Sequence, residues 1–354
     1  MSYTNGLDNP ELYFQTKLYT GNGSTQSITL DGSEDMQPDF VWIKQRNAGS
    51  TYHWLADVIR GVTKYLSSNV NSVEATETTQ ITSFDSDGFS LGNKTNTNDN
   101  SDTYVAWNWK AGTAFSNDAS ATGIGSIDSS GSINTTAGFS IISWTGTGSA
   151  GTVAHGLGVQ PQIVFVKNRS DTASWNVYTV IGGGGKGLFL NEQNGFDSDS
   201  SYFNNGTAST TTFPVGTANT ANGSSDNMIA YCFANVKGYS KIFQYEGNSN
   251  SDGTFVYLGF RPAWLMVKPV DASDNWVMFD NKRHNAKNSS TSPFFNYANK
   301  DFAETTDTKL IDLTSNGFKI RSSGNTVNRS STFVGMAFAE SPFVNSSGVP
   351  NNGR

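Results

Sequence analysis

The sequence predicts an all-β protein built from three tandem antiparallel β-sandwich domains. Aromatic residues make up 12% of the 354-residue chain, which is rich in Ser, Thr, Asn and Gly and poor in leucine. Aromatic and β-branched residues favour strands, and closely spaced turn-forming residues are typical of sandwiches. No window has a convincing helical period, since the best candidate, residues 54–65, is interrupted by Gly61. A three-copy internal repeat supplies the number of domains.

The repeat is anchored by a proline that precedes a lysine by six residues in every copy. A tryptophan follows the same proline by 14 residues in the second and third copies and by 16 in the first. An aromatic–x–Gly motif lies 17 to 19 residues before the proline, and an apolar closing strand is centred 68 to 73 residues after it. The copies of proline, lysine and tryptophan are Pro38, Lys44 and Trp54; Pro161, Lys167 and Trp175; and Pro262, Lys268 and Trp276.

Strand signals follow one another closely in the first copy. Residues 14–20 alternate weakly as a strand, and Asn22-Gly23 is a hairpin signal that predicts that residues 26–30 pair back onto it. Residues 39–44 are nearly all apolar, which fits a strand covered on both faces, and residues 52–59 are its expected partner. Further strands are expected at residues 79–84, 89–91 and 103–109. This density of short strands is typical of a β-sandwich.

The repeat divides the chain into five segments. We expect β-sandwich repeat 1 with an N-terminal arm at residues 1–112, a Ser/Gly/Thr-rich linker at 113–137, repeat 2 at 138–238, repeat 3 at 239–343 and a polar tail at 344–354. The linker prediction rests on low apolar content, with one strand allowed at 125–127. Repeats 2 and 3 abut, so a fixed relative orientation is expected for them.

Charge, hydropathy and cysteine content limit the binding partners and the cellular compartment that we expect for this protein. The net charge is −7 and the pI about 5.0, so no basic face is expected for nucleic acid. No apolar run is long enough to span a membrane, and residues 1–15 do not resemble a secretory signal, which weighs against a host adhesin. We expect the single cysteine, Cys232, to be a small buried hydrophobic residue. The low cysteine content suits assembly in a bacterial cytoplasm.

The repeated lysines and tryptophans are the candidate ligand-binding residues. An exposed indole offers a flat apolar face to a sugar ring, and lysines at one place in each copy could form a shared ligand contact. A core role for the tryptophans and a strand-end lysine lying over an aromatic ring are the competing interpretations. Arg46 and Arg169 also match between the first two copies, but Val270 takes that place in the third. The candidates are Lys44, Lys167, Lys268, Trp54, Trp175 and Trp276.

No catalytic, cofactor-binding or metal-binding residue is predicted. His53, His155 and His284 fall at different places in the repeat, and one cysteine suggests no zinc site. The acidic stretches 85–88 and 197–199 read as β-turns, with calcium binding left open because a full set of ligands is not visible. Nothing marks a carboxylate pair for glycoside cleavage.

Several stretches resemble a repeat family in structural proteins of marine tailed bacteriophages. They include Pro-Asp-Phe-Val-Trp-Ile-Lys at 38–44 and His-Gly-Leu-Gly-Val-Gln-Pro at 155–161, with further matches at 13–29, 84–92, 104–112 and 336–343. The resemblance spans about residues 13–343 and implies jelly-roll or concanavalin-like sandwiches in tail fibres, appendages or head decorations. It implies no catalytic residues. Family fibres often carry an attachment region ahead of the repeats, so its absence here makes a decoration protein as good an expectation as a fibre.

The expected function is that of a non-enzymatic virion structural protein. It would be assembled in the host cytoplasm and exposed on the particle as a tail fibre, appendage or head decoration, with capsid or tail proteins as partners. A homo-oligomer is expected, although no heptad segment supports a trimeric fibre. A host-surface glycan is the candidate ligand; nucleic acid, membrane and cofactors are not expected. The alternative is a virion-borne glycan-degrading enzyme.

Overall fold

The computed structural model describes residue 7 and residues 9–283, 294–305 and 310–341. About 40% of the chain is strand and 7% helix, so the prediction of an all-β fold is confirmed. Each α-helix in the described residues has only four residues. None of the described helices is long and apolar enough to cross a membrane. Most of the expected N-terminal arm, residues 1–6 and 8, and the expected polar tail at 344–354 lie outside the described residues.

Repeat 1 contains one four-stranded sheet, in the order β1-β9-β3-β4, and a smaller sheet, β2-β8-β7. Strands β5 and β6 form a two-stranded ribbon. Its elements are η1 (Pro10–Leu12), β1 (Phe14–Thr20), β2 (Gln26–Ile28), β3 (Phe40–Gln45), β4 (Trp54–Asp57), β5 (Lys64–Tyr65), β6 (Ala75–Thr76), β7 (Ile81–Asp85), β8 (Gly88–Leu91), α1 (Thr95–Asn98) and β9 (Thr103–Trp109).

Repeat 2 is preceded by two strands that join its sheet, giving the seven-stranded order β10-β11-β12-β18-β14-β15-β16, and β13 pairs with β17. The elements are β10 (Thr113–Asn117), α2 (Ala119–Thr122), β11 (Ser129–Asn134), β12 (Phe139–Thr145), β13 (Gly151–Ala154), β14 (Ile163–Asn168), β15 (Asn176–Thr179), β16 (Leu188–Phe189), α3 (Ser200–Phe203), β17 (Thr212–Val215), α4 (Asn219–Asn222) and β18 (Asn227–Phe233).

Repeat 3 has a five-stranded sheet, β19-β26-β21-β22-β23, and a smaller sheet, β20-β25-β24. The elements are β19 (Ser240–Glu246), β20 (Phe255–Tyr257), β21 (Trp264–Pro269), β22 (Val277–Asp280), β23 (Phe295–Tyr297), β24 (Ile311–Thr314), β25 (Gly317–Ile320), α5 (Asn325–Asn328) and β26 (Thr332–Phe338). All three large sheets therefore share one antiparallel order, in which β1, β12 and β19 correspond, as do β9, β18 and β26.

The segment expected to be a linker is folded. Strands β10 and β11 extend the sheet of repeat 2 by pairing along β12, with Ser130 opposite Ser143. Small side chains permit this close pairing: a Cβ added to Gly131 would lie 1.9 Å from the carbonyl oxygen of Ile141. Low apolar content therefore reflects a strand added to a sheet edge, and the linker prediction is corrected.

The hairpin predicted at Asn22-Gly23 is also corrected. Strand β1 pairs only with β9 along its whole length, and β2 pairs with β8 in the smaller sheet. The side chain of Asn22 instead bonds to the buried Asn98 at 3.2 Å, so it anchors a crossing between two sheets. Strands β1 and β9 themselves have the predicted limits.

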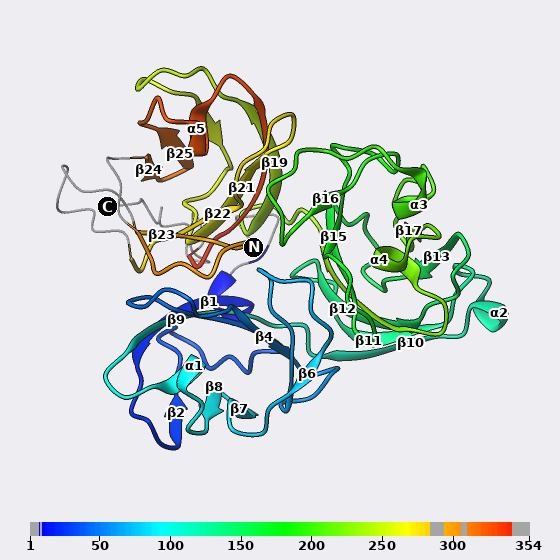
Figure 1. Cartoon of the computed structure of the whole chain (residues 1–354), viewed down its shortest axis with the longest axis horizontal. Helices are drawn as coiled ribbons and strands as arrows, with labels where there is room; N and C mark the ends of the chain where they lie inside the picture. Colours follow the sequence, from blue (N-terminus) through cyan, green and yellow to red (C-terminus); the bar gives the residue numbers. More distant parts are fainter. Residues whose placement is uncertain (1–6, 8, 284–293, 306–309, 342–354) are drawn as a thin grey trace, which may run out of the picture.

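One aromatic core joins the three repeats. Figure 1 shows three lobes, blue to cyan, green, and yellow to red, grouped around a common centre instead of following one another along a line. At this centre the last residues of the three equivalent strands β9, β18 and β26 meet. The ring centroids of Trp109, Phe233 and Phe338 are 5.6 to 6.2 Å apart, and each pair is edge-to-face. Edge-to-face packing of this kind adds about 0.5–1.5 kcal/mol per pair beyond burial.

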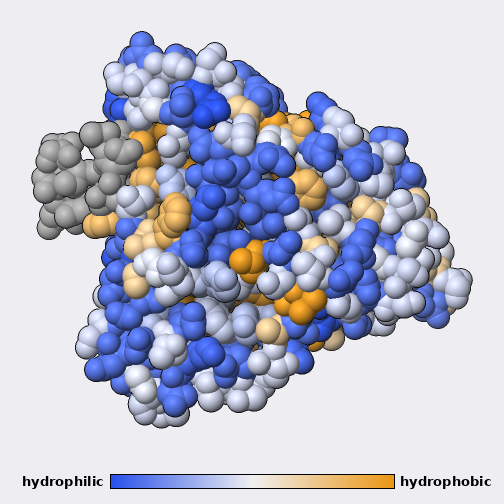
Figure 2. Space-filling model, in the orientation of Figure 1, coloured by the Kyte–Doolittle hydropathy of each residue, from blue (hydrophilic) through white to orange (hydrophobic). Residues whose placement is uncertain are grey.

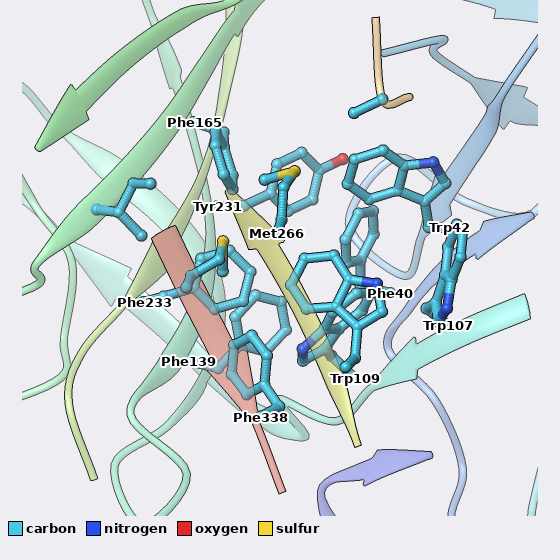
Figure 3. Packing of buried hydrophobic residues seen from close by; sticks show 14 of the residues in the cluster. Phe40, Trp42, Trp107, Trp109, Phe139, Phe165, Tyr231, Phe233, Met266 and Phe338 are labelled. Atoms are coloured by element: carbon cyan, nitrogen blue, oxygen red, sulfur yellow. The ribbon is translucent and has the colours of Figure 1, made fainter. Parts of the chain in front are cut away.

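The central core extends outward from this triangle. Phe40 of β3 stacks on Tyr231 of β18 with centroids 4.4 Å apart, joining repeats 1 and 2. Trp107 meets Trp264 at 6.4 Å between repeats 1 and 3. Figure 3 shows Phe40, Trp107 and Tyr231 converging from separate ribbons. Each repeat also has an outer core of its own, which includes Phe89, Phe213 and Phe318 in repeats 1, 2 and 3. The independence of three domains in a row is therefore not confirmed.

Candidate functional site

The six candidate ligand-binding residues all lie in the interior. The exposed fraction is 0% for Lys44, Lys167, Lys268 and Trp175, 1% for Trp276 and 4% for Trp54. A sugar can stack only on an exposed aromatic face. None of these side chains presents such a face, so we do not assign ligand binding to them. Their contacts show what they do instead.

Two of the tryptophans connect neighbouring repeats. The Trp175 Nε1–H of repeat 2 donates to the Ser67 carbonyl of repeat 1 at 2.9 Å. The Trp276 Nε1–H of repeat 3 donates to the Phe189 carbonyl of repeat 2, also at 2.9 Å. The indole thus satisfies a buried backbone acceptor of the preceding repeat while its ring fills the shared core.

Trp54 is not the equivalent of these tryptophans. Strand register pairs Trp54 with Ile43, whereas the corresponding positions in the other repeats pair Asn176 with Val166 and Val277 with Val267. The residue that matches the two tryptophans is therefore His53. Trp54 faces the outer core of repeat 1, where its ring centroid lies 3.8 Å from that of Tyr65. The different proline–tryptophan spacing in the first copy was the signal of this exchange.

His53 makes the third contact of the same kind. Trp42 Nε1 lies 2.8 Å from His53 Nδ1. Because an indole nitrogen can only donate, Nδ1 is the acceptor and the ring proton lies on Nε2. His53 Nε2 then donates to the Tyr297 carbonyl of repeat 3 at 3.0 Å. Burial holds the pKa of His53 well below its usual value, which keeps the ring neutral. Repeat 1 thus donates a hydrogen bond to repeat 3, repeat 2 donates one to repeat 1, and repeat 3 donates one to repeat 2. These heterologous contacts form a closed ring.

Two of the three repeated lysines also donate a hydrogen bond to the preceding repeat. Lys167 Nζ donates to the Asn71 carbonyl of repeat 1 at 3.2 Å, and Lys268 Nζ donates to the Gln193 carbonyl of repeat 2 at 2.7 Å. Lys44 donates within its own repeat, to Thr51 Oγ1 at 2.9 Å. Removal from water lowers the pKa to about 8 for Lys44 and Lys167 and to about 7 for Lys268.

Bidentate ion pairs close two of the three junctions. Arg169 of repeat 2 contacts Glu74 of repeat 1 at 2.8 and 3.0 Å. Arg46 of repeat 1 contacts Glu304 of repeat 3 at 2.8 and 2.9 Å. Paired parallel hydrogen bonds of this type are among the stronger polar contacts in proteins. The two arginines that match in the sequence are therefore structural.

The third junction carries apolar residues at the same positions. The Glu74 and Glu304 backbone N–H groups donate to the carbonyls of Arg169 and Arg46, respectively, and in the same way the Phe196 N–H of repeat 2 donates to the Val270 carbonyl of repeat 3 at 2.6 Å. Val270 belongs to the shared core, and Phe196 packs against it. A valine and a phenylalanine thus replace the arginine and the glutamate.

A second layer of buried charge lies behind each ion pair. Arg60 bonds to the carboxylate of Asp57, which also accepts a hydrogen bond from the hydroxyl of Tyr231 in repeat 2 at 2.6 Å. Arg283 likewise bonds to Asp280 at 2.7 Å, and the carboxylate accepts from Trp107 Nε1 of repeat 1 at 3.1 Å. Both acids are fully buried.

This layer is also absent from the junction of repeats 2 and 3. Thr179 and Gly182 take the places of the acid and the arginine, since the Gly182 N–H donates to Thr179 Oγ1 at 3.0 Å. A Cβ on Gly182 would lie 2.6 Å from the ring of Phe196, so this ring fills the space of the missing arginine. Met336 stands on β26 where the other repeats have Trp107 and Tyr231.

Three buried asparagines, which the sequence reasoning missed, fasten the aromatic–x–Gly loops. Asn98, Asn222 and Asn328 end the short helices α1, α4 and α5 and are fully buried. Their side-chain oxygens accept from loop N–H groups at 2.9 to 3.1 Å. The loop glycine has no room for a side chain, because a Cβ on Gly21 would lie 2.1 Å from the Asp99 carbonyl oxygen. The available signal was an asparagine seven or eight residues before the small residue of each closing strand.

The remaining reactive groups form no metal-binding cluster within the described part of the chain. His155 is buried, and desolvation lowers its pKa to about 4. Burial raises the pKa of the Cys232 thiol to about 12, so it is unreactive. Among the described residues no group of three or more His, Cys, Asp or Glu side chains could hold a metal ion. The acidic stretch 85–88 forms the turn between β7 and β8, and Asp85 accepts from Ser83 Oγ. The prediction of a β-turn at 197–199 is corrected, because Asp197 forms an isolated bridge with Gly187 and Asp199 is the N-cap of α3. His284 lies outside the described residues.

In the described part of the chain, two surface grooves are candidate ligand sites. One, of about 420 Å³, lies between β19 and β20 and is bordered by the exposed rings of Phe255 and Tyr257. The other, of about 340 Å³, lies beside β11 and β12 and is polar, with Asp118, Asp128 and Trp144 in its lining. Both volumes fall in the range of ligand pockets, roughly 300–1,000 Å³.

Residues 9–342 match one family, described as Domain of unknown function (DUF7483). The chain belongs to the DUF7483 family. A single family match covers all three repeats. No curated protein matches the chain.

Proposed function

We propose that this protein is a non-enzymatic structural protein exposed on a bacteriophage particle, as a tail fibre, appendage or head decoration. The observation that carries the proposal is the closed ring of inter-repeat contacts. Catalytic sites place groups with perturbed pKa values in an open cleft. Here Lys268 and His53, whose pKa values are strongly lowered, are enclosed at the contacts between repeats. These buried polar groups hold the repeats together, and the resulting rigidity suits a particle component.

The repeats themselves are proposed to be small sandwiches of jelly-roll or concanavalin-like type, within the limits 1–112, 138–238 and 239–343. An outer core between each large sheet and its smaller sheet supports this. The sandwiches would share their inner faces and fold as one body, because the central core cannot be buried by one repeat alone.

Other particle proteins, or further copies of this chain, are the proposed partners. The face in Figure 2 is mostly hydrophilic with scattered hydrophobic spots, which is normal for a protein surface. At the junction of repeats 1 and 3, however, Tyr52 is 47% and Phe302 54% exposed. Exposed large aromatics of this kind are enriched in protein–protein contacts.

A glycan-degrading enzyme is the second candidate, because two carboxylates line the polar groove beside β11. Asp118 and Asp128 both also serve as local caps, accepting from the backbone of Ala121 and Ala119 at 3.1 and 2.8 Å. Hydrogen bonds from Ser120 and Ala121 lower the pKa of Asp118, which keeps it ionised and unsuited to act as the general acid. Under this candidate, Asp128→Asn would abolish glycan cleavage.

The deciding experiment is quantitative mass spectrometry and cryo-EM of purified particles from the virus that encodes the chain. We expect the protein in the particle, in hundreds of copies if it decorates the head or in about six to eighteen if it forms a tail appendage. Absence from particles would overturn the proposal. Release of reducing ends from a polysaccharide, lost in Asp128→Asn, would establish the enzyme.

A further inference from the structure

Repeat 3 departs from the others on the outer face of its smaller sheet. Strands β2, β13 and β20 occupy one position, because Ile28, Val153 and Val256 each pair with the phenylalanine of the neighbouring strand. The residues on either side of this apolar position are the exposed Ser27 and Thr29 in repeat 1, the half-buried Thr152 and the buried Ala154 in repeat 2, and the exposed Phe255 and Tyr257 in repeat 3.

The two aromatic residues do not serve the core. Phe255 is 43% and Tyr257 61% exposed, whereas Val256 between them is 5% exposed and fills the outer core. Exposed aromatic side chains on an edge strand favour unwanted association. Repeats 1 and 2 build the same sheet position without them, so the fold does not require them. A ligand that uses their ring faces explains their presence.

Polar side chains surround these rings in the groove between β19 and β20. Lys241 Nζ donates to the Tyr257 carbonyl at 2.8 Å and lies 5.4 Å from the centroid of the Tyr257 ring. These two contacts hold the ammonium group of Lys241 beside the ring. Gln244 and Glu246 of β19 line the same groove. A flat apolar face beside amide and carboxylate groups matches a saccharide, whose C–H faces are apolar and whose hydroxyls both donate and accept.

An added peptide strand fits the groove less well. The free edge of β19 is blocked at both ends, because the Ile242 N–H donates to Asn235 Oδ1 at 2.7 Å and Thr254 Oγ1 donates to the Glu246 carbonyl at 2.6 Å. In repeat 2 the equivalent edge of β12 is already paired with β11. The open feature of repeat 3 is therefore its side-chain surface and not its backbone edge.

We propose that the groove between β19 and β20 binds a saccharide, with Phe255 and Tyr257 as its stacking platform. The inference rests on the proposed function, in which a host-surface glycan is the expected ligand, and it assigns that ligand to one place on repeat 3. Repeats 1 and 2 lack the platform, so each chain carries one such site among its repeats.

The test is a screen of the whole protein on an array of immobilised bacterial surface polysaccharides and plant and algal oligosaccharides. Cellobiose, laminaribiose, maltose and chitobiose are titrated in parallel by NMR. At least one saccharide should bind, and the variant Phe255→Ser with Tyr257→Thr, which copies repeat 1, should bind at least ten-fold more weakly. The control, Tyr52→Ser with Phe302→Ser, removes exposed aromatics elsewhere and should bind normally. Gln244→Trp fills the groove while keeping both platform residues in the sequence and should also abolish binding.

No binding by the wild-type protein, or equal binding by the platform variant with unchanged thermal stability, would overturn the inference. Self-association that the platform variant loses, without saccharide binding, would instead identify a contact between copies and would equally overturn it. Detection of the protein in particles is independent of these results. A negative array with a particle-borne protein therefore rejects the groove alone, whereas a positive array with particles lacking the protein rejects the structural role alone.

Discussion

The junction between repeats 2 and 3 is apolar at positions where the other two junctions are charged. Between repeats 1 and 2, Arg169 bonds to Glu74 in front of a buried Asp57–Arg60 pair. The junction of repeats 3 and 1 has the same arrangement. Between repeats 2 and 3 the corresponding positions hold Val270, Phe196, Thr179, Gly182 and Met336. The crossing indole or imidazole and the crossing backbone hydrogen bond persist at all three.

The geometry of the ring of repeats therefore does not depend on charge at the junctions. A buried ion pair is often no more stabilising than well-packed apolar residues of similar volume, whereas one half of a pair is strongly destabilising. Each of the three junctions, as far as the structure describes them, has either the complete charged set of residues or the complete apolar set, and none combines the two. The residues of a junction should therefore be exchangeable as a set but not singly.

The largest effect is expected from breaking one charged set. Arg60→Ala leaves the fully buried carboxylate of Asp57 without its cation, and we expect unfolding free energy to fall by about 3–5 kcal/mol. Urea unfolding followed by tryptophan fluorescence measures the change. The matched variant gives this junction the complete apolar set through Asp57→Thr, Arg60→Gly, Glu74→Phe, Arg169→Val and Tyr231→Met. It should lose less than the single variant, and a larger loss would show that the two sets are not interchangeable.

The apolar junction should respond to a different perturbation. Phe196→Ala empties the space beside Gly182, and because the ring is only half-buried we expect a loss of about 2 kcal/mol. The loss should change little between 0.1 M and 1 M NaCl, since the ring carries no charge and its contact with Lys186, whose Nζ lies 5.6 Å from the ring centroid, is a weak cation–π contact. The loss caused by Arg169→Ala should shrink at 1 M NaCl as screening weakens the ion pair that it removes. Equal salt responses would contradict the distinction between the junctions.

Much of the fold follows from local sequence, because strand and turn signals act over a few residues. The limits of β1 and β9 and the burial of β3 on both faces were predictable from alternation and apolar runs. The ring of repeats was not, because equally apolar strands can be covered by a neighbouring sheet or by a neighbouring repeat. The β10–β11 hairpin was missed for a related reason: Ser- and Gly-rich strands on a sheet edge have the composition of a linker.

The candidate site was predictable in position but not in role. The regular Lys44, Lys167 and Lys268 did mark equivalent places, yet a pattern cannot show whether a side chain faces solvent or the next repeat. The more informative signals were departures from the repeat. The two-residue shift of Trp54 marked the exchange with His53, and Val270 marked the apolar junction.

Replacing the crossing indoles should have a similar effect at a charged and at the apolar junction. Trp175→Phe and Trp276→Phe each remove an N–H that satisfies a buried carbonyl at 2.9 Å, which should cost about 1–2 kcal/mol. The control is Trp54→Phe, because Trp54 Nε1 has no hydrogen-bond partner within the described part of the chain. It should lose less than either of the others in thermal unfolding. An equal loss for all three would mean that ring volume, and not the crossing bond, is what matters.

A pH dependence of stability should also appear, and we expect it to be strongest at the apolar junction. The pKa of Lys268 falls from 10.5 in the unfolded chain to about 7 in the fold, chiefly because burial removes the ammonium from water. Between these values the unfolded chain binds the extra proton, so stability should rise with pH, by at most about 1.4 kcal/mol per pH unit. Unfolding midpoints from pH 7 to 9.5 should therefore rise in the wild type and less in Lys268→Met. The range stops there because burial raises the pKa of Tyr239 and other tyrosines, which reverses the trend at higher pH. Lys44→Met should flatten the rise only above pH 8, where its own pKa lies, and identical profiles for the two variants would contradict the lower pKa of Lys268.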